Sequence, residues 1–110
     1  FADAPCGGVE NITTLSASGA QAIIFSTGIG NPIGHPISPT IKVTGNPRTA
    51  ALMPENIDVN LCDVIEKGLS YKEAEERLNK ELIDVLGGKP TTSELLGETE
   101  ITVSRAALSL

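Results

Sequence analysis

The segment at residues 27–39, TGIGNPIGHPISP, constrains the fold of this chain more than any other. It holds three glycines and three prolines, so it cannot form a regular helix or a central strand. The prolines at positions 32, 36 and 39 fix the backbone φ angle, and the glycines at positions 28, 30 and 34 permit positive φ angles. We therefore expect a structured loop that is held in one conformation.

Short apolar segments that are typical of strands flank this loop on both sides. Residues 21–26, QAIIFS, form a nearly continuous apolar run of the kind found in buried parallel strands. Residues 40–44, TIKVT, alternate β-branched residues around one lysine. Because the loop is long enough for a crossover, we predict that residues 22–26 and 40–44 are neighbouring parallel strands, apolar on both faces.

Capping signals predict the helices. Asn46 followed by Pro47 begins a short helix, which Pro54 ends. Ser70 with Glu73 forms a capping box that begins an amphipathic helix over residues 71–86. Its charged face is expected to form two i,i+4 ion pairs, Glu73/Arg77 and Glu76/Lys80. Weaker patterns predict a helix at 9–18, a short strand or extended link at 57–60, a one-to-two-turn helix ending at 68, a short helix opened by the Thr91/Glu94 box, and an edge-like strand at 98–104.

The order of these elements predicts an α/β fold with a small, mostly parallel sheet flanked by helices, in a single domain over residues 1–110. A chain of 110 residues can bury one core but not two. With 40% hydrophobic and 20% charged residues, it is neither disordered nor a collagen-like or disulfide-dense protein. A start at Phe1 fits either one modest domain or a piece cut from a longer polypeptide.

Charge and hydropathy restrict the partners. A net charge of -6 has the wrong sign for binding nucleic acid or an anionic membrane surface. The apolar runs are too short for a signal peptide or a membrane span, so we expect a cytoplasmic protein. Cys6 and Cys62 are far apart and form no C-x-x-C motif, which agrees with a reducing compartment.

Residues that can carry chemistry gather after the first predicted strand, where open parallel sheets bind their ligands. Glycine N–H groups in the loop can approach an anion closely, and side-chain donors lie among them. His35, the one histidine, is flanked by Gly34 and Pro36, which cannot hide it; it could be a metal ligand, an acid–base group or an anion contact. Lys42 and Arg48 could bind carboxylate or be surface charges. The loop could equally be a tightly turned connection without chemistry.

Two other kinds of site are poorly supported. The third glycine of GIGNPIG comes one residue too late for the dinucleotide pattern G-x-G-x-x-G, and Pro32 stands where the helix should begin. One histidine, two distant cysteines and acids that lie mostly on the predicted long helix do not make a metal-ligand cluster. A metal site with three ligands would need residues from elsewhere.

The order of the motifs resembles a known family. Residues 19–63 give an apolar strand, TG-x-G, a Gly/Pro loop, a P-x-IK strand, an N-P-x-T segment and IDVN. This order resembles the C-terminal part of the altronate and galactarate dehydratase family, to which sulfolactate sulfo-lyase large subunits are also similar. The later GGKPTTSELLG and the closing segment are similar to the family's ending, so the resemblance covers nearly the whole chain. Ile29 departs from the Arg that many members carry in TG-R-G, which bears on the substrate and the leaving group.

The resemblance implies a metal-dependent hydro-lyase that dehydrates a sugar acid of the galactarate or altronate type to a 2-keto-3-deoxy acid. It implies a divalent metal, iron or manganese, in the full-length enzyme and none in the isolated domain, which we expect to be inactive. The implied partners are the sugar acid and the remaining domains of the enzyme, with a homo-oligomer as a further option.

The residues expected at the site follow from the loop and from the resemblance together. Six are expected to line the substrate cleft against the missing domain, namely Ser26, Thr27, Gly28, Gly30, Asn31 and Lys42, and His35 is expected to act in acid–base catalysis. The alternative is a structural or oligomerisation module that does not contact substrate. A loop open to solvent with convergent N–H groups would favour the site, and a loop buried by its own domain would favour the module.

Overall fold

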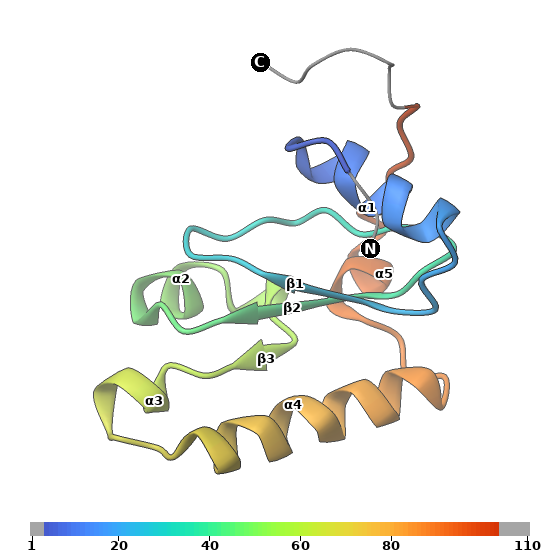
Figure 1. Cartoon of the computed structure of the whole chain (residues 1–110). Coiled ribbons are helices and arrows are strands. Elements are labelled where there is room, and N and C mark those ends of the chain that lie inside the picture. The colour runs from blue at the N-terminus through green and yellow to red at the C-terminus, as the bar shows by residue number, and fades with distance from the viewer. Residues whose placement is uncertain (1–3, 104–110) are drawn as a thin grey trace.

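The computed structural model describes residues 4–103, in which a parallel sheet lies between two helices, α1 on one face and α4 on the other (Figure 1). This arrangement confirms the predicted α/β class. The elements follow one another along the chain as α1 (Gly8–Ala17), β1 (Ile23–Ser26), β2 (Thr40–Thr44), α2 (Pro47–Leu52), the 3-10 helix η1 (Pro54–Asn56), β3 (Val59–Asn60), α3 (Asp63–Glu66), α4 (Tyr71–Leu86) and α5 (Thr92–Leu96).

The sheet has the strand order β1-β2-β3, and both neighbouring pairs are parallel. The predicted pairing of β1 with β2 is therefore confirmed, with Phe25 opposite Lys42 in the register. The expectation that both strands are buried on two faces is right for β2 and wrong for β1. β1 is an edge strand, so Ile24 is 47% exposed and Ser26 is exposed as well.

The apolar core lies on the α4 face of β2. Ile41 and Val43 point to this side, where they pack with Val59 of β3 and Val85 of α4. Partly buried leucines at positions 61, 78 and 82 extend the cluster. Burying each of these large aliphatic side chains contributes on the order of 1.5–3 kcal/mol, which holds α4 against the sheet.

The predicted caps are present. The Asn46 side chain accepts a hydrogen bond from the Arg48 N–H at 3.0 Å, and Pro47 occupies the first turn of α2. Capping boxes also begin α4 and α5, as their sequences predict. The predicted ion pairs of α4 are wrong, however. Lys80 binds Asp84 at 2.6 Å, and Arg77 lies 3.3 Å from Asp63 of α3 because Glu73 is already engaged by Ser70.

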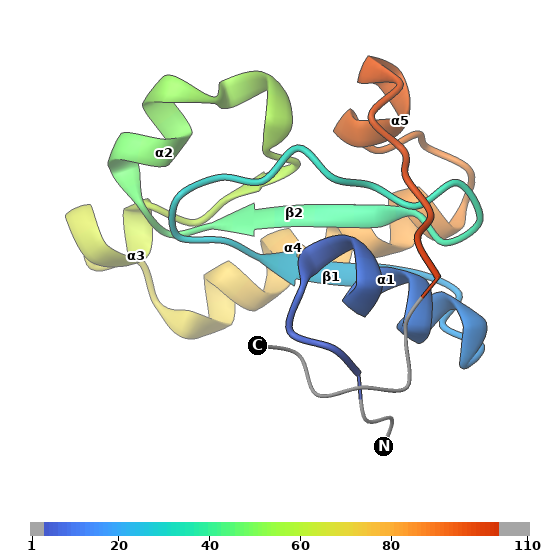
Figure 2. The ribbon, with the colours of Figure 1, turned by 90° about the horizontal axis from the view of Figure 1, so that it is seen from above.

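The strand predicted at residues 98–104 is not formed over 98–103, and residue 104 lies outside the described residues. In its place, the segment makes one parallel bridge, in which Gly34 donates to the Glu98 carbonyl at 2.8 Å and accepts from the Glu100 N–H at 3.0 Å. The ladder cannot continue, because Pro32 and Pro36 on the other side of the bridge lack N–H groups. The segment crosses the loop and reaches α1, as Figure 2 shows.

The loop at residues 27–39 returns from the carboxyl end of β1 to the amino end of β2 on the α1 side of the sheet (Figure 1). Of its three glycines only Gly30 adopts a positive φ angle, of 89°. Position 34 requires a glycine for a different reason, because a Cβ atom there would collide with Ser93 and lie 3.2 Å from the Glu98 carbonyl oxygen. The loop therefore needs one glycine for its backbone angle and one for close packing.

Candidate functional site

The face of β2 opposite the apolar core is polar, and the loop at residues 27–39 packs against it. The Thr44 hydroxyl donates to the Thr27 carbonyl at 2.8 Å, and the Thr40 hydroxyl donates to the Ser38 carbonyl at 3.2 Å. Lys42 lies between these two threonines on the same face, and all three side chains are buried. Threonine hydroxyls of β2 thus bind carbonyl groups of the loop, and the Thr27 N–H adds a backbone bond to the Val43 carbonyl at 2.9 Å.

Lys42 is the centre of this polar face. Its ammonium donates to the Ser93 hydroxyl at 2.6 Å and to the Pro32 carbonyl at 3.0 Å, and the residue is 0% exposed. Burial lowers the pKa of Lys42, while the negative charges of Asp58 and Glu98 oppose that shift. The Ser93 hydroxyl and the Pro32 carbonyl thus accept from N–H donors of the Lys42 ammonium that would otherwise be buried without an acceptor.

Asp58 holds β2 to the beginning of α5. Its carboxylate accepts from the Lys42 backbone N–H at 2.7 Å and from the Thr92 backbone N–H at 2.7 Å. The Thr92 hydroxyl adds a third bond at 3.2 Å. The sequence analysis missed Asp58, Thr92 and Ser93. A lysine in the middle of a β-branched strand is the signal that could have prompted a search for buried partners of this kind.

The first part of the loop is anchored to α2. The Gly28 carbonyl accepts from the Asn46 side chain at 2.6 Å and from the Thr49 hydroxyl at 2.7 Å. The Gly30 N–H donates to the Thr27 hydroxyl oxygen at 3.1 Å. Within residues 4–103, the N–H groups of positions 28, 29 and 31 have no hydrogen-bond partner. Ile29 is 89% exposed and Gly28 is exposed as well, whereas Asn31 is half-buried, so this part of the loop is open to solvent mainly at its first two positions.

The second part of the loop is bonded within the domain. The Ile33 N–H donates to the Asn31 side chain at 2.9 Å, and the Gly34 N–H donates to Glu98. His35 Nδ1 accepts from the N–H groups of Ile37 and Ser38, each at 3.3 Å. These contacts leave few N–H groups for an anion between residues 33 and 38, which is the arrangement expected of a structural connection.

The prediction that Gly34 and Pro36 leave His35 accessible is wrong. The residue is 3% exposed, because the turn that its own ring caps packs into the domain. Burial lowers the pKa of His35. A nitrogen that accepts two N–H donors carries no proton, so the ring is neutral with its proton on Nε2.

The residues expected to line the cleft do not gather at one point. Those at positions 26–31 end or directly follow β1, whereas His35 is in the later part of the loop, closer in sequence to the beginning of β2 at Thr40. The buried ammonium of Lys42 bonds to the carbonyl of Pro32, a loop position between residues 26–31 and His35. Lys42 is therefore not a surface charge. Arg48 is exposed at the beginning of α2. Contact of any of these residues with substrate stays a prediction.

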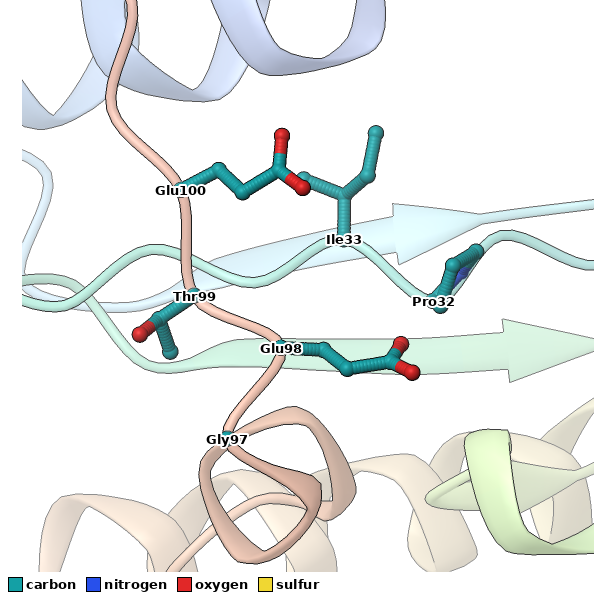
Figure 3. A pocket seen from close by; sticks show the side chains of 6 residues that line it. All are labelled: Pro32, Ile33, Gly97, Glu98, Thr99 and Glu100. Atoms are coloured by element: carbon teal, nitrogen blue, oxygen red, sulfur yellow. The ribbon is translucent and has the colours of Figure 1, made fainter.

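A cavity of about 450 Å³ lies where residues 98–103, which we call the crossing segment, pass over the loop. It is lined by Pro32, Ile33 and residues 97–100 (Figure 3). The side chains of Glu98 and Glu100 point from the crossing segment toward the loop, and that of Thr99 points away (Figure 3). Two carboxylates in this hollow repel an anion, so it is a poor place for the carboxylate of an acidic substrate.

The described part of the chain does not fit a metal site. No group of three His, Cys, Asp or Glu side chains within residues 4–103 is placed to hold an ion. Cys6 is exposed and Cys62 is buried, and neither forms a disulfide there. A three-ligand site of the usual kind would need side chains from elsewhere. No helix among the described residues has the length and apolar character needed to cross a membrane.

Comparison with known proteins gives one family and three relatives. The family described as D-galactarate/altronate dehydratase, C-terminal, matches residues 1–109. The chain is 39% identical over 105 residues to the (2R)-sulfolactate sulfo-lyase subunit beta of Chromohalobacter salexigens, which is 96% of this chain and 27% of that protein. It is 26% identical over 107 residues to the altronate dehydratase of Escherichia coli K12, or 97% of the chain and 21% of the enzyme. Identity to the altronate dehydratase of Bacillus subtilis 168 is 26% over 98 residues, 89% of the chain and 20% of the enzyme.

Proposed function

The chain belongs to the D-galactarate/altronate dehydratase C-terminal family, and on that premise we propose that it is the C-terminal part of a longer lyase that acts on a 2-hydroxy carboxylic acid. The observation that carries this proposal is the family match over residues 1–109, with relatives named as an altronate dehydratase and a sulfolactate sulfo-lyase. These relatives belong to one lyase family, although their names give different leaving groups.

One reaction pattern accommodates both kinds of substrate. Altronate and sulfolactate each carry a hydroxyl group on C2, and C3 carries a hydroxyl in the first and a sulfonate in the second. A base removes the C2 proton, the electron pair forms the C2–C3 double bond, and the C3 substituent leaves with its bonding pair, either as sulfite or, once an acid has protonated the departing hydroxyl, as water. The resulting enol tautomerises to a 2-oxo acid, which for a sugar acid is a 2-keto-3-deoxy acid. Removing a proton next to a carboxylate needs a base and donors that stabilise the developing charge.

The contribution of this chain would be to bind the substrate carboxylate at residues 28–31. Three N–H groups there lack a partner within residues 4–103, and Gly28 and Ile29 are exposed near the carboxyl end of an edge strand of a parallel sheet. The side chains of Ser26, Thr27 and Asn31 lie in or beside this segment and can add contacts. This assignment is narrower than the whole loop, because the N–H groups of residues 33, 34, 37 and 38 are bonded within the domain.

The rest of the catalytic machinery would come from outside the described residues. The proposal includes a divalent metal, iron or manganese, with ligands that residues 4–103 do not supply. Since one relative is named as a subunit beta, the protein is proposed to work with a second subunit or with further domains, and a homo-oligomer is compatible with this. The proposal also includes a cytoplasmic location, and the net charge of -6 disfavours nucleic-acid and anionic membrane partners.

A structural module is the second candidate function. The observation in its favour is that the domain uses most polar groups of the loop itself, including His35 Nδ1 and the Lys42 ammonium. In this case the domain would brace the rest of the enzyme and would not contact substrate.

The experiment for the lyase proposal compares leaving groups. The longer protein would be assayed with (2R)-sulfolactate, altronate and galactarate, following the 2-oxo acid in every case and sulfite in the first. Since identity is 39% to the sulfo-lyase subunit and 26% to the altronate dehydratases, we expect the highest kcat/KM with sulfolactate. A higher kcat/KM with a sugar acid would reassign the leaving group to water, and inactivity on all three would remove the proposal.

A further inference from the structure

The open segment at residues 28–31 is held at both of its ends. At its beginning the Gly28 carbonyl accepts from two side chains of the α2 region, Asn46 and Thr49. At its end the carbonyl of the next residue, Pro32, accepts from the Lys42 ammonium at 3.0 Å. The position of the three N–H groups between these anchors therefore depends on both of them.

The Lys42 anchor joins parts of the chain that are far apart in sequence. The same ammonium donates to Ser93 on α5 at 2.6 Å, and the Lys42 backbone N–H is bonded to Asp58. Ser93 in turn packs against Gly34, and its carbonyl accepts from the Glu98 N–H at 2.9 Å. Lys42 thus lies where β2, the loop, α5 and the crossing segment meet.

The Lys42 ammonium is buried inside the domain. It donates to the buried Ser93 hydroxyl and to the carbonyl of Pro32, and its aliphatic stem is covered along its length, since Lys42 is 0% exposed. A substrate could reach the nitrogen only if the loop moved off β2. The geometry therefore favours an internal role over direct contact with a ligand.

We propose that Lys42 is a positioning residue, which fixes the N–H groups of residues 28–31 by holding the Pro32 carbonyl and Ser93 together. This inference rests on the proposed function, in which those N–H groups bind the substrate carboxylate. A small displacement of binding groups is enough to reduce a reaction rate about 100-fold, because catalysis depends on geometry.

The test uses the longer protein with Lys42→Met, which keeps the stem and removes the donors. Lys72→Met is the control, since Lys72 is exposed on α4. Hydrogen exchange by mass spectrometry would follow peptides over residues 28–34 and over 73–86, and steady-state kinetics would give kcat and KM for the best substrate. We expect faster exchange at 28–34 with unchanged exchange at 73–86, and a kcat/KM about 100-fold lower that includes a fall in kcat. The control should match the wild type in both measurements.

Other outcomes overturn the inference in distinguishable ways. Unchanged exchange at 28–34 would show that Lys42 does not hold the segment, and a raised KM with unchanged kcat and exchange would make it a substrate contact. Faster exchange with unchanged kinetics in an active enzyme would remove the link to catalysis. If Lys42→Met does not fold, Ser93→Ala removes one of the two bonds and must produce a smaller change of the same pattern. If the wild type is inactive on every substrate, the proposed function fails, and the exchange result alone decides whether Lys42 holds the segment.

Discussion

Gly34 and Ser93 are packed so closely that a Cβ atom at position 34 would collide with the Ser93 Cβ atom. The contact brings the loop and α5 together beside Lys42, which donates to the Ser93 hydroxyl at 2.6 Å. Gly34 also makes both hydrogen bonds of the bridge to the crossing segment. One small residue thus lets three distant segments meet.

Replacing Gly34 by Ala should destabilise the domain. The added methyl group would meet Ser93 and the Glu98 carbonyl oxygen, and overpacking of this kind costs about 1–3 kcal/mol. Gly28→Ala is the matched control, since nothing lies within 4 Å of its Cβ position and its φ angle is not positive. Urea unfolding would measure both variants. Equal free energies of unfolding for the two would mean that the contact does not exist in solution.

The stability of the domain should depend on His35 at mildly acidic pH. Burial lowers the pKa of His35 in the folded protein, so the unfolded chain takes up the proton first as the pH falls. The free energy of unfolding should therefore decrease from about pH 6.5, the ordinary value for histidine, and the decrease should end below the folded pKa. Protonation would also remove the two hydrogen bonds that Nδ1 accepts.

The measurement is urea unfolding between pH 7.5 and 5.5 for the wild type and His35→Gln. The chain has one histidine, so no other side chain is expected to titrate in this range at its ordinary pKa. His35→Gln should be less stable at pH 7.5 and should lack the pH-dependent step. The same slope in both proteins would assign the step to another group.

Ile29 offers a direct probe of the open segment. In the longer protein, Ile29→Glu would place a negative charge beside the unpartnered N–H groups, and its repulsion of a substrate carboxylate should raise KM about 10-fold. Ile37→Glu is the control, because Ile37 is 76% exposed in the same loop but lies in the part whose N–H groups are bonded within the domain. Unchanged KM in both variants would favour the structural-module function.

Local signals predicted most of the fold because they depend on residues that are close in sequence. The Ser70/Glu73 capping box and the Asn46–Pro47 pair begin α4 and α2 as expected. The alternating pattern at residues 98–104 predicted a strand that did not form over the described positions, since a ladder also needs a partner with N–H groups and the loop offers prolines. A pattern within one segment cannot report on that partner.

The candidate site was less predictable for the same reason. The glycines and prolines indicated a structured loop, but they could not show which N–H groups the domain would use itself. Lys42 was interpreted as a cleft residue or a surface charge, whereas its partner Ser93 is 51 positions away. A lysine within a β-branched strand signals that it needs buried partners, but it cannot identify Ser93, because the packing of α5 against the loop creates that contact.

The most direct test of the lyase proposal compares the 110-residue chain with the longer protein in one assay. Both would be incubated with (2R)-sulfolactate, altronate and galactarate and with added iron or manganese, and formation of the 2-oxo acid would be measured. Far-ultraviolet circular dichroism would check that the short chain is folded. We expect product from at least one substrate with the longer protein and none with the folded short chain, because residues 4–103 supply no metal site. Turnover by the short chain alone, or inactivity of the longer protein on every substrate, would contradict the proposal.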